Sequence, residues 1–260
     1  MRAYTAFVKK EWLESVRSFR LPVLGLILLL LGAMSPLAAR YMPEIVAGFL
    51  PAGMFVELSK PQAIDAWLQF FKNFSQIGLL ALAVMHSGML SAEYSKGTLV
   101  CILTKGMPRK SVIFAKFTAA ALSWSALYIF SVLVCMGYTW FFWGKDAVSG
   151  ETDTFHLMFC LGGLWLLGVM FLAILLLGGV LFTGAYGSLL FAGGAALAQI
   201  IAGMFPEAPR YVPLSLAAGS AGALWGTQGD SVPAEAALAG AAVTVACLFL
   251  AVLIFEKRKI

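Results

Sequence analysis

The stretch "LPVLGLILLLLGAMSPLAA", residues Leu21–Ala39, contains no charged side chain. An apolar helix of about 20 residues crosses the roughly 30 Å hydrocarbon core of a membrane, because each residue adds about 1.5 Å. The rest of the chain resembles this stretch: 61% of its 260 residues are hydrophobic and only 12% are charged. A soluble domain carries roughly 25% charged residues. The sequence therefore predicts an all-α polytopic membrane protein with a single transmembrane domain over residues 1–260.

Six segments are long and apolar enough to be transmembrane helices. We expect helices because the apolar runs are continuous rather than alternating, and an open sheet edge is not stable in lipid. The predicted spans are Leu21–Met42, Trp67–Ala92, Val112–Trp143, Phe155–Phe182, Ser188–Phe205 and Ala234–Phe255. Residues 206–233 are rich in proline, glycine and apolar side chains. We expect an extracytoplasmic loop or a re-entrant segment there.

Basic residues are unevenly distributed between the two sides of these spans. Six spans place both termini on one side, and that side carries all but five of the 18 Lys and Arg residues. Because basic residues concentrate in cytoplasmic segments, we expect both termini in the cytoplasm. The five basic residues on the outer side are Arg40, Lys60, Lys72, Lys145 and Arg210.

Residues 1–20 form an amphipathic pattern at helical spacing. Charged side chains gather on one side of the helix, while Leu13 and Glu11 break the pattern. We expect an interfacial helix that enters the membrane at Leu21. A basic topology signal with no further role is the alternative interpretation. The apolar side of this helix comprises Tyr4, Phe7, Val8, Trp12, Val16 and Phe19.

Sequence motifs for several kinds of chemistry are absent. The chain has no G-x-x-x-x-G-K-[ST] phosphate-binding loop, no H-E-x-x-H and no G-x-S-x-G. Its cysteines form no C-x-x-C pair, so we expect them to pack as small apolar side chains rather than to bind zinc or form disulfides. These cysteines are Cys101, Cys135, Cys160 and Cys247. We therefore expect neither catalysis nor a bound metal in this chain.

The predicted spans offer few groups that bind a driving ion. Ion-coupled transporters place ionisable residues near the membrane centre. Here we expect Arg40, Lys72, Glu93 and Lys116 near span ends, where long side chains reach the interface. His86 lies within the second predicted span, and we expect it to be buried and hydrogen-bonded rather than a ligand. Uphill transport by this chain would then draw its energy from another chain.

The polar segment 93–111, "EYSKGTLVCILTKGMPRKS", separates the second and third predicted spans. Thr98 suits the N-cap of a short helix over Leu99–Lys105. Gly106 suits a left-handed C-terminal position, and Pro108 suits the first position of the next helix. These signals predict a rigid, partly apolar helix on the cytoplasmic side. Such a helix either contacts another protein or only lies on lipid.

This segment also matches the pattern E-x-x-x-G-T-L, followed by L, by R-x-x-[IV] and by K. The matching residues are Glu93, Gly97, Thr98, Leu99, Leu103, Arg109, Val112 and Lys116. The pattern resembles the loop after the second span of ABC-2 type permeases, the membrane subunits of many bacterial ATP-binding-cassette exporters. The N-terminal "VKKEWLESVRSFR" resembles their elbow helix, and "FEKRKI" resembles their basic tail. One departure is Gly106, where these permeases often have proline.

The resemblance implies a non-catalytic permease subunit of an ATP-driven exporter in the bacterial inner (cytoplasmic) membrane. It implies a homodimer or heterodimer that forms the substrate path, and cytoplasmic ATPase subunits that bind ATP and magnesium. The short helix would be a coupling helix docked on the ATPase. The resemblance assigns ATPase contact to Glu93, Gly97, Thr98, Leu99, Cys101, Ile102, Leu103, Lys105 and Arg109. It assigns the elbow helix to Phe7, Val8, Trp12, Val16 and Phe19.

Two other functions stay open at the level of sequence. A non-pumping membrane scaffold or immunity protein that binds a hydrophobic peptide would have similar basic inner loops and apolar outer loops. An ion-coupled transporter would require His86 to titrate. The sequence identifies neither the substrate nor the residues that line its path.

Overall fold

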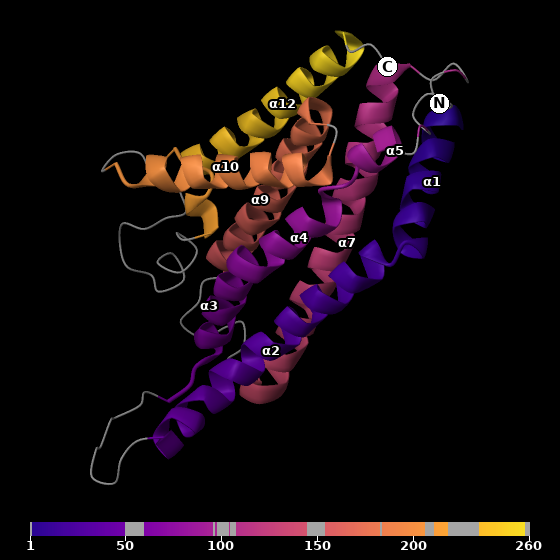
Figure 1. The fold of residues 1–260 in the computed structure, drawn as a ribbon. Coiled ribbons are helices and arrows are strands. Elements are labelled where there is room, and N and C mark those ends of the chain that lie inside the picture. Colours follow the sequence, from indigo (N-terminus) through magenta and orange to yellow (C-terminus); the bar gives the residue numbers. More distant parts are fainter. Residues whose placement is uncertain are drawn as a thin grey trace.

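Helices make up almost all of the described chain, and no strand occurs within it. The computed structural model describes residues 2–49, 60–95, 97, 104, 108–144, 154–182, 184–205, 211–217 and 234–257. Figure 1 shows the helices packed as an elongated bundle, with the N- and C-termini at the same end. The all-α prediction is therefore confirmed.

Among the described residues, six helices are long and apolar enough to cross a membrane, as predicted. The second of them is built from three consecutive segments. In chain order the spans are α2 (Arg20–Phe49), α3 (Ala63–Asn73) with η1 (Phe74–Gly78) and α4 (Leu79–His86), α7 (Arg109–Trp143), α9 (Thr154–Leu181), α10 (Ala185–Gly203) and α12 (Ala234–Lys257). Their order along the chain agrees with the six predicted spans, so the polytopic architecture is confirmed.

The second span differs from its predicted bounds of Trp67–Ala92. It begins earlier because Gln62 and Asp65 form a capping box, in which the Gln62 backbone N–H donates to Asp65 Oδ2 at 2.8 Å. It ends earlier, at His86, where a turn over residues 87–90 precedes the short helix α5 (Ser91–Ser95). Residues 87–92 were predicted as part of the span, but the structure places a turn at 87–90 and the start of α5 there, and this turn separates Glu93 from the membrane helix.

The N-terminal helix α1 (Arg2–Arg17) is separate from the first span. The chain breaks at Phe19, whose φ of 58° lies in the left-handed region that helices exclude. α1 packs beside the first part of α7 (Figure 1). Trp12 and Val16 are exposed, whereas Phe7 is buried. The two sides of α1 thus face different surroundings, and the position of α1 relative to the membrane stays a prediction.

The core of the bundle lies around α9, the most buried of the spans. The indole of Trp124 on α7 fits against Gly168 on α9, where an added Cβ would come within 2.3 Å of the ring. Trp124 Nε1 also donates to the Trp165 carbonyl at 3.1 Å, and Tyr128 donates to the Leu161 carbonyl at 2.9 Å.

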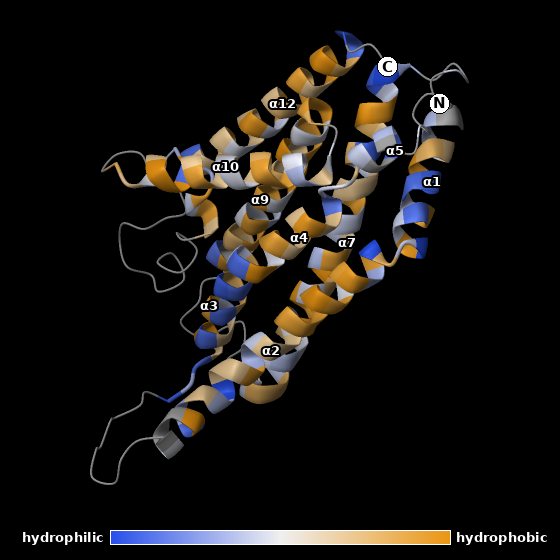
Figure 2. Cartoon of the chain, viewed as in Figure 1, coloured by the Kyte–Doolittle hydropathy of each residue, from blue (hydrophilic) through white to orange (hydrophobic). Residues whose placement is uncertain are grey.

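Figure 2 shows apolar residues along α2, α4 and α12 and hydrophilic residues gathered on α1 and α3.

Candidate functional site

The predicted ATPase-contact segment is described mainly at its two flanks. Thr98, Leu99, Cys101, Ile102, Leu103 and Lys105 lie outside the described residues, as does Gly106. Within the segment, Thr104 is helical and exposed. The first flank contains Glu93 in α5 and Gly97, and the second begins with Pro108 and Arg109. The candidate site therefore consists of the contacts that attach these two flanks to the neighbouring helices.

Lys116 is the most deeply buried charged residue of this region, with a relative exposure of 1%. Its Nζ lies 2.9 Å from Glu11 Oε2 and 3.1 Å from Glu93 Oε2, and it donates to the Met89 carbonyl at 3.1 Å. The contacts to Glu11 Oε2 and to the Met89 carbonyl are hydrogen bonds, and the contact to Glu93 Oε2 is an ion pair. Lys116 lies within the first eight residues of α7, near the span end where the sequence placed it, but protein buries its ammonium group. α1 covers Lys116, and two carboxylates hold it inside the protein.

Lys10 completes a closed ring of charges with the same two carboxylates. Its Nζ lies 2.9 Å from Glu11 Oε1 and 3.1 Å from Glu93 Oε1. Each carboxylate therefore contacts Lys10 through one oxygen and Lys116 through the other. The charged ring, defined as Lys10, Glu11, Glu93 and Lys116, joins α1, α5 and α7. Glu14 adds a further contact to Lys10 at 2.8 Å.

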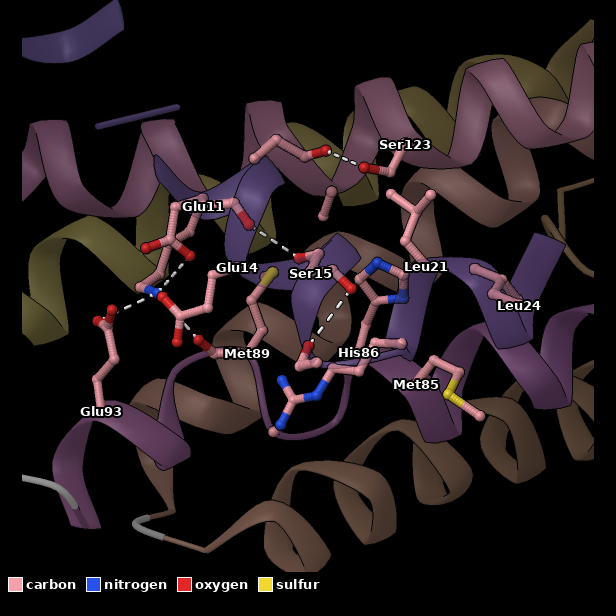
Figure 3. A pocket seen from close by; sticks show the side chains of 16 residues that line it. Glu11, Glu14, Ser15, Leu21, Leu24, Met85, His86, Met89, Glu93 and Ser123 are labelled. Carbon is pink, nitrogen blue, oxygen red and sulfur yellow. Dashed lines mark hydrogen bonds and ion pairs between the residues drawn. The ribbon is translucent and has the colours of Figure 1, made fainter. Parts of the chain in front are cut away.

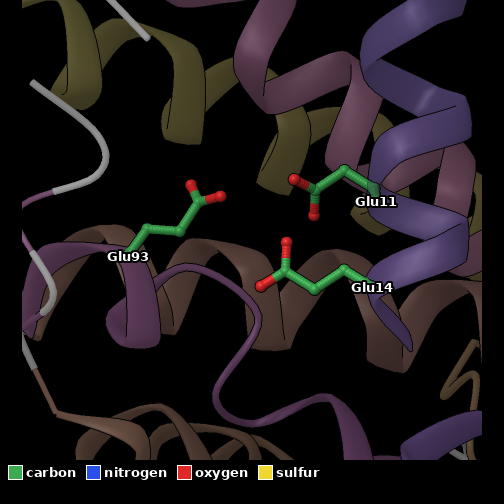
Figure 4. Close-up of side chains that lie close together, drawn as sticks. All are labelled: Glu11, Glu14 and Glu93. Carbon is green, nitrogen blue, oxygen red and sulfur yellow. The ribbon is translucent and has the colours of Figure 1, made fainter. Parts of the chain in front are cut away.

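The electrostatics of the ring favour a charged Lys10. Partial burial alone would lower its pKa, but the carboxylates of Glu14, Glu11 and Glu93 outweigh that effect and raise the pKa above the ordinary 10.5. Glu11, Glu14 and Glu93 point toward one another (Figure 4), with carboxylate oxygens within 4.8 Å of each other. The ammonium groups of Lys10 and Lys116 balance two of these three negative charges, so the cluster already carries most of its countercharge.

A second set of contacts holds the other flank of the loop. Arg109 begins α7, and its Nη1 donates to the carbonyls of Phe255 at 3.1 Å and Glu256 at 3.0 Å. These carbonyls belong to the last turn of α12, where they lack partners within the helix and form the negative end of its dipole. Pro108 is the N-cap of α7 rather than its first helical residue. Arg109 thus ties the start of α7 to the end of α12.

A cavity of about 90 Å³ lies next to the charged ring, between α1, α2, α4 and α7. Figure 3 shows Glu11, Glu14 and Glu93 on one side of it and His86, Ser15 and Leu21 on the other. His86 is half-buried and hydrogen-bonds through Nδ1 to the Leu82 carbonyl at 3.1 Å. The expected hydrogen-bonded role of His86 is confirmed.

Gly97 adopts a left-handed conformation, which the sequence predicted only for Gly106. Its φ is 66°, and its backbone N–H donates to the Tyr94 carbonyl at 3.2 Å. Glycine adopts this conformation without a Cβ penalty, so α5 ends here and the chain turns.

Comparison with known proteins identifies the family. The family model described as "ABC-2 family transporter protein" matches residues 5–260. This chain belongs to the ABC-2 transporter family. The uncharacterized transmembrane protein YxlG of Bacillus subtilis (strain 168) is similar to it, with 24% identity over 220 residues that cover 83% of each chain. The ABC-2 protein is therefore a multi-pass membrane component of a transport system.

The structure of this ABC-2 protein brings together residues that the sequence treated separately. Glu93 and Arg109, both assigned by resemblance to the ATPase contact, make contacts with other helices. Glu11 was noted only because it broke the amphipathic pattern of α1. That misfit was the signal for a buried partner, and Lys116 is that partner. Lys10 gave no such signal. Of the residues assigned to the elbow helix, Phe7, Val8, Trp12 and Val16 lie in α1, and Phe19 lies at the break after it.

Proposed function

We propose that this chain is the permease subunit of an ATP-driven exporter. It acts as a dimer, with a second copy or a related chain, and forms the substrate path. ATP and magnesium bind to a separate cytoplasmic ATPase subunit, which contacts the loop after the second span. Membership of the ABC-2 family supports this proposal, as does the lack of a phosphate-binding loop in the sequence.

The observation that carries the proposal is that both flanks of the loop are fastened to different helices. Glu93 before the loop contacts α1 and α7 through Lys10 and Lys116. Arg109 after the loop contacts α12. A force applied to the loop therefore acts on three helices at once, which a simple connector between two spans would not require.

The mechanism follows from these attachments. When ATP draws two ATPase subunits together, each loop moves with the subunit that it contacts. The charged ring passes this displacement to α1 and α7, and Arg109 passes it to α12. Rigid-body movement of these helices then changes the access of the substrate path. Export is the direction we propose, because the family resemblance is to exporter permeases.

The test is purification in mild detergent of the chain expressed with a candidate ATPase subunit. We expect the ATPase to co-purify with the wild-type chain, and Leu103→Asp to remove it while membrane insertion is unchanged. Lys110→Asp is the matched control, because Lys110 is exposed, lies on α7 and is not among the predicted ATPase contacts. A wild-type chain that binds no ATPase, or a Leu103→Asp chain that binds it normally, would overturn the proposal.

A further inference from the structure

The second span carries polar side chains on one face of its outer half, away from the charged ring. Asp65, Gln69, Lys72 and Gln76 follow one another at spacings of three or four residues, which places them on one side of a helix. Lys72 and Gln76 are exposed, and Asp65 and Gln69 are half-buried. Figure 2 shows the resulting hydrophilic colour on α3. We call these four residues the polar stripe.

The opposite face of the same segment is buried and aromatic. Trp67, Phe70, Phe71 and Phe74 are each at most 1% exposed. The rings of Phe70 and Phe74 stack with centroids 4.3 Å apart, and Phe74 contacts Tyr128 on α7. This packing fixes the rotation of the helix. The polar stripe therefore faces away from the chain's own core.

The polar stripe reaches the middle of the membrane. At about 1.5 Å per residue, Gln76 lies about 15 Å from His86 at the inner end of the span, half the thickness of a 30 Å hydrocarbon core. Lys72 lies about 21 Å from the same end. Asn73 Nδ2 donates to Ser35 Oγ at 3.1 Å, and Ser35 lies between Arg20 and Arg40 on α2. Lys72 was expected near a span end, but nine residues of helix precede it.

The π-helix η1 marks the inner limit of the polar stripe. It spans Phe74–Gly78, and π segments change the rotation of the residues that follow them. From Ile77 within η1 onward, the exposed residues of the span are apolar: Ile77, Leu80 and Val84 are 47–62% exposed. The exposed face of one span thus changes from polar to apolar near the membrane centre.

Lipid is an unfavourable neighbour for this face. The ammonium group of Lys72 forms no ion pair or hydrogen bond within the described part of the chain, although the Lys72 carbonyl accepts from Ser75 Oγ at 3.1 Å. A lysine exposed at the centre of a bilayer costs roughly 2.5–3.5 kcal/mol, and Lys72, about 6 Å outward of the centre, bears part of that cost. Such residues normally face protein or a water-filled cavity. Polar surroundings are therefore favourable for Lys72, and the described part of this chain does not supply them.

Symmetry restricts what those surroundings are. In a two-fold homodimer, each surface meets its own copy, so a stripe near the axis faces a second stripe. Two Lys72 ammonium groups that face each other repel unless water or an anion lies between them. A dry helix–helix contact across this face is therefore unfavourable, and a hydrated gap that attracts negative charge is favourable.

We propose that the polar stripe lines a water-filled substrate path between two permease subunits and binds an anionic group of the transported substrate, a carboxylate or a phosphate. Lys72 supplies the charge, and the Gln76 amide donates a hydrogen bond one turn deeper. This inference rests on the proposed function, because it places the path between two permeases. It adds the chemical class of the substrate.

Thiol chemistry tests the inference without knowledge of the substrate. Gln76→Cys is introduced into the full chain with its four native cysteines replaced, and reconstituted in liposomes with and without the ATPase subunit. The probes are sulfonatoethyl methanethiosulfonate, which is anionic, and trimethylammonioethyl methanethiosulfonate, which is cationic. We expect Gln76→Cys to react with both and to favour the anionic reagent by about tenfold relative to a free thiol.

Three matched variants define the outcome. Ile129→Cys, exposed on α7 beside Tyr128, has a similar depth and should stay unreactive. Lys72→Arg should keep the preference for the anionic reagent, and Lys72→Gln should abolish it; gel filtration verifies that both fold. An unreactive Gln76→Cys, or a preference that is absent or survives Lys72→Gln, would overturn the inference. Loss of ATPase co-purification would instead overturn the proposed function, since that assay does not involve Lys72.

Discussion

The Nζ of Lys116 lies 2.9 Å from Oε2 of Glu11, although 105 residues separate them in the chain. This contact joins the N-terminal helix to the third span. Glu93, at the start of the loop after the second span, contacts the same ammonium group at 3.1 Å. Three segments that are distant in sequence therefore meet at one buried charge.

Lys116→Met should strongly destabilise the protein. The change leaves Glu11 and Glu93 as buried carboxylates without their shared cation, which costs about 3–5 kcal/mol. Thermal unfolding in detergent should show a clear decrease in Tm. Lys110→Met, an exposed lysine on the same helix, should change the Tm little. A Lys116→Met protein as stable as the Lys110→Met control would show that the ring does not stabilise the fold.

Arg109→Gln should loosen the end of α12. Hydrogen bonds from a charged donor contribute about 1.5–3 kcal/mol, and this change removes two that reach the last carbonyls of the helix. Amide hydrogen exchange near Glu256 and Lys257 should become about tenfold faster, which corresponds to about 1.4 kcal/mol. Lys110→Gln is the control. Unchanged exchange at the end of α12 in Arg109→Gln would contradict the link between these two helices.

Gly168→Ala should disrupt the contact between α7 and α9. The new methyl group would overlap the Trp124 indole, whose nearest atoms lie 2.3–2.5 Å from an added Cβ. Overpacking of this kind costs about 1–3 kcal/mol. Gly162→Ala, on the same helix with no atom within 4 Å of an added Cβ, should be neutral or slightly stabilising. Equal Tm values for the two variants would argue against the close fit at Trp124.

The contribution of Lys10 should not depend on pH in the physiological range. Its pKa is raised above 10.5 by the carboxylates of Glu14, Glu11 and Glu93, so the stabilisation is complete below pH 10.5 and is lost as the pH rises through the raised pKa. Lys10→Gln should lower the Tm by the same small amount at pH 7 and pH 9. A difference that disappears by pH 9 would show that Lys10 loses its proton early.

The six spans could be predicted from the sequence because a membrane requires long apolar runs. The bounds of the second span could not, since the capping box of Gln62 and Asp65 starts the helix four residues before Trp67, and the turn at residues 87–90 interrupts a run that has the hydropathy of a span. The depth of Lys72 in the membrane was misjudged because the predicted span began too late. Lys72 lies nine residues inside its helix, rather than near its end.

The charged ring could not be predicted from the sequence. Hydropathy places Lys116 near a membrane boundary but does not reveal that α1 folds over it. Glu11 broke the amphipathic pattern of α1, and an acid on an apolar face is a sign of a buried partner. The partner itself depends on how α1 packs against α7. That packing is a tertiary property, set by contacts such as the Tyr4–Thr118 hydrogen bond at 2.8 Å.

The central claim is that the ring transmits movement of the loop to α1, and hydrogen exchange of α1 tests it most directly. The complex with its ATPase is compared without nucleotide and after trapping with ATP and vanadate. We predict that trapping changes exchange in α1 of the wild type, and that Glu93→Gln removes this change although the ATPase still co-purifies. Glu44→Gln, an exposed acid near the far end of α2, should respond like the wild type. An α1 response in Glu93→Gln equal to that of the wild type would contradict the account.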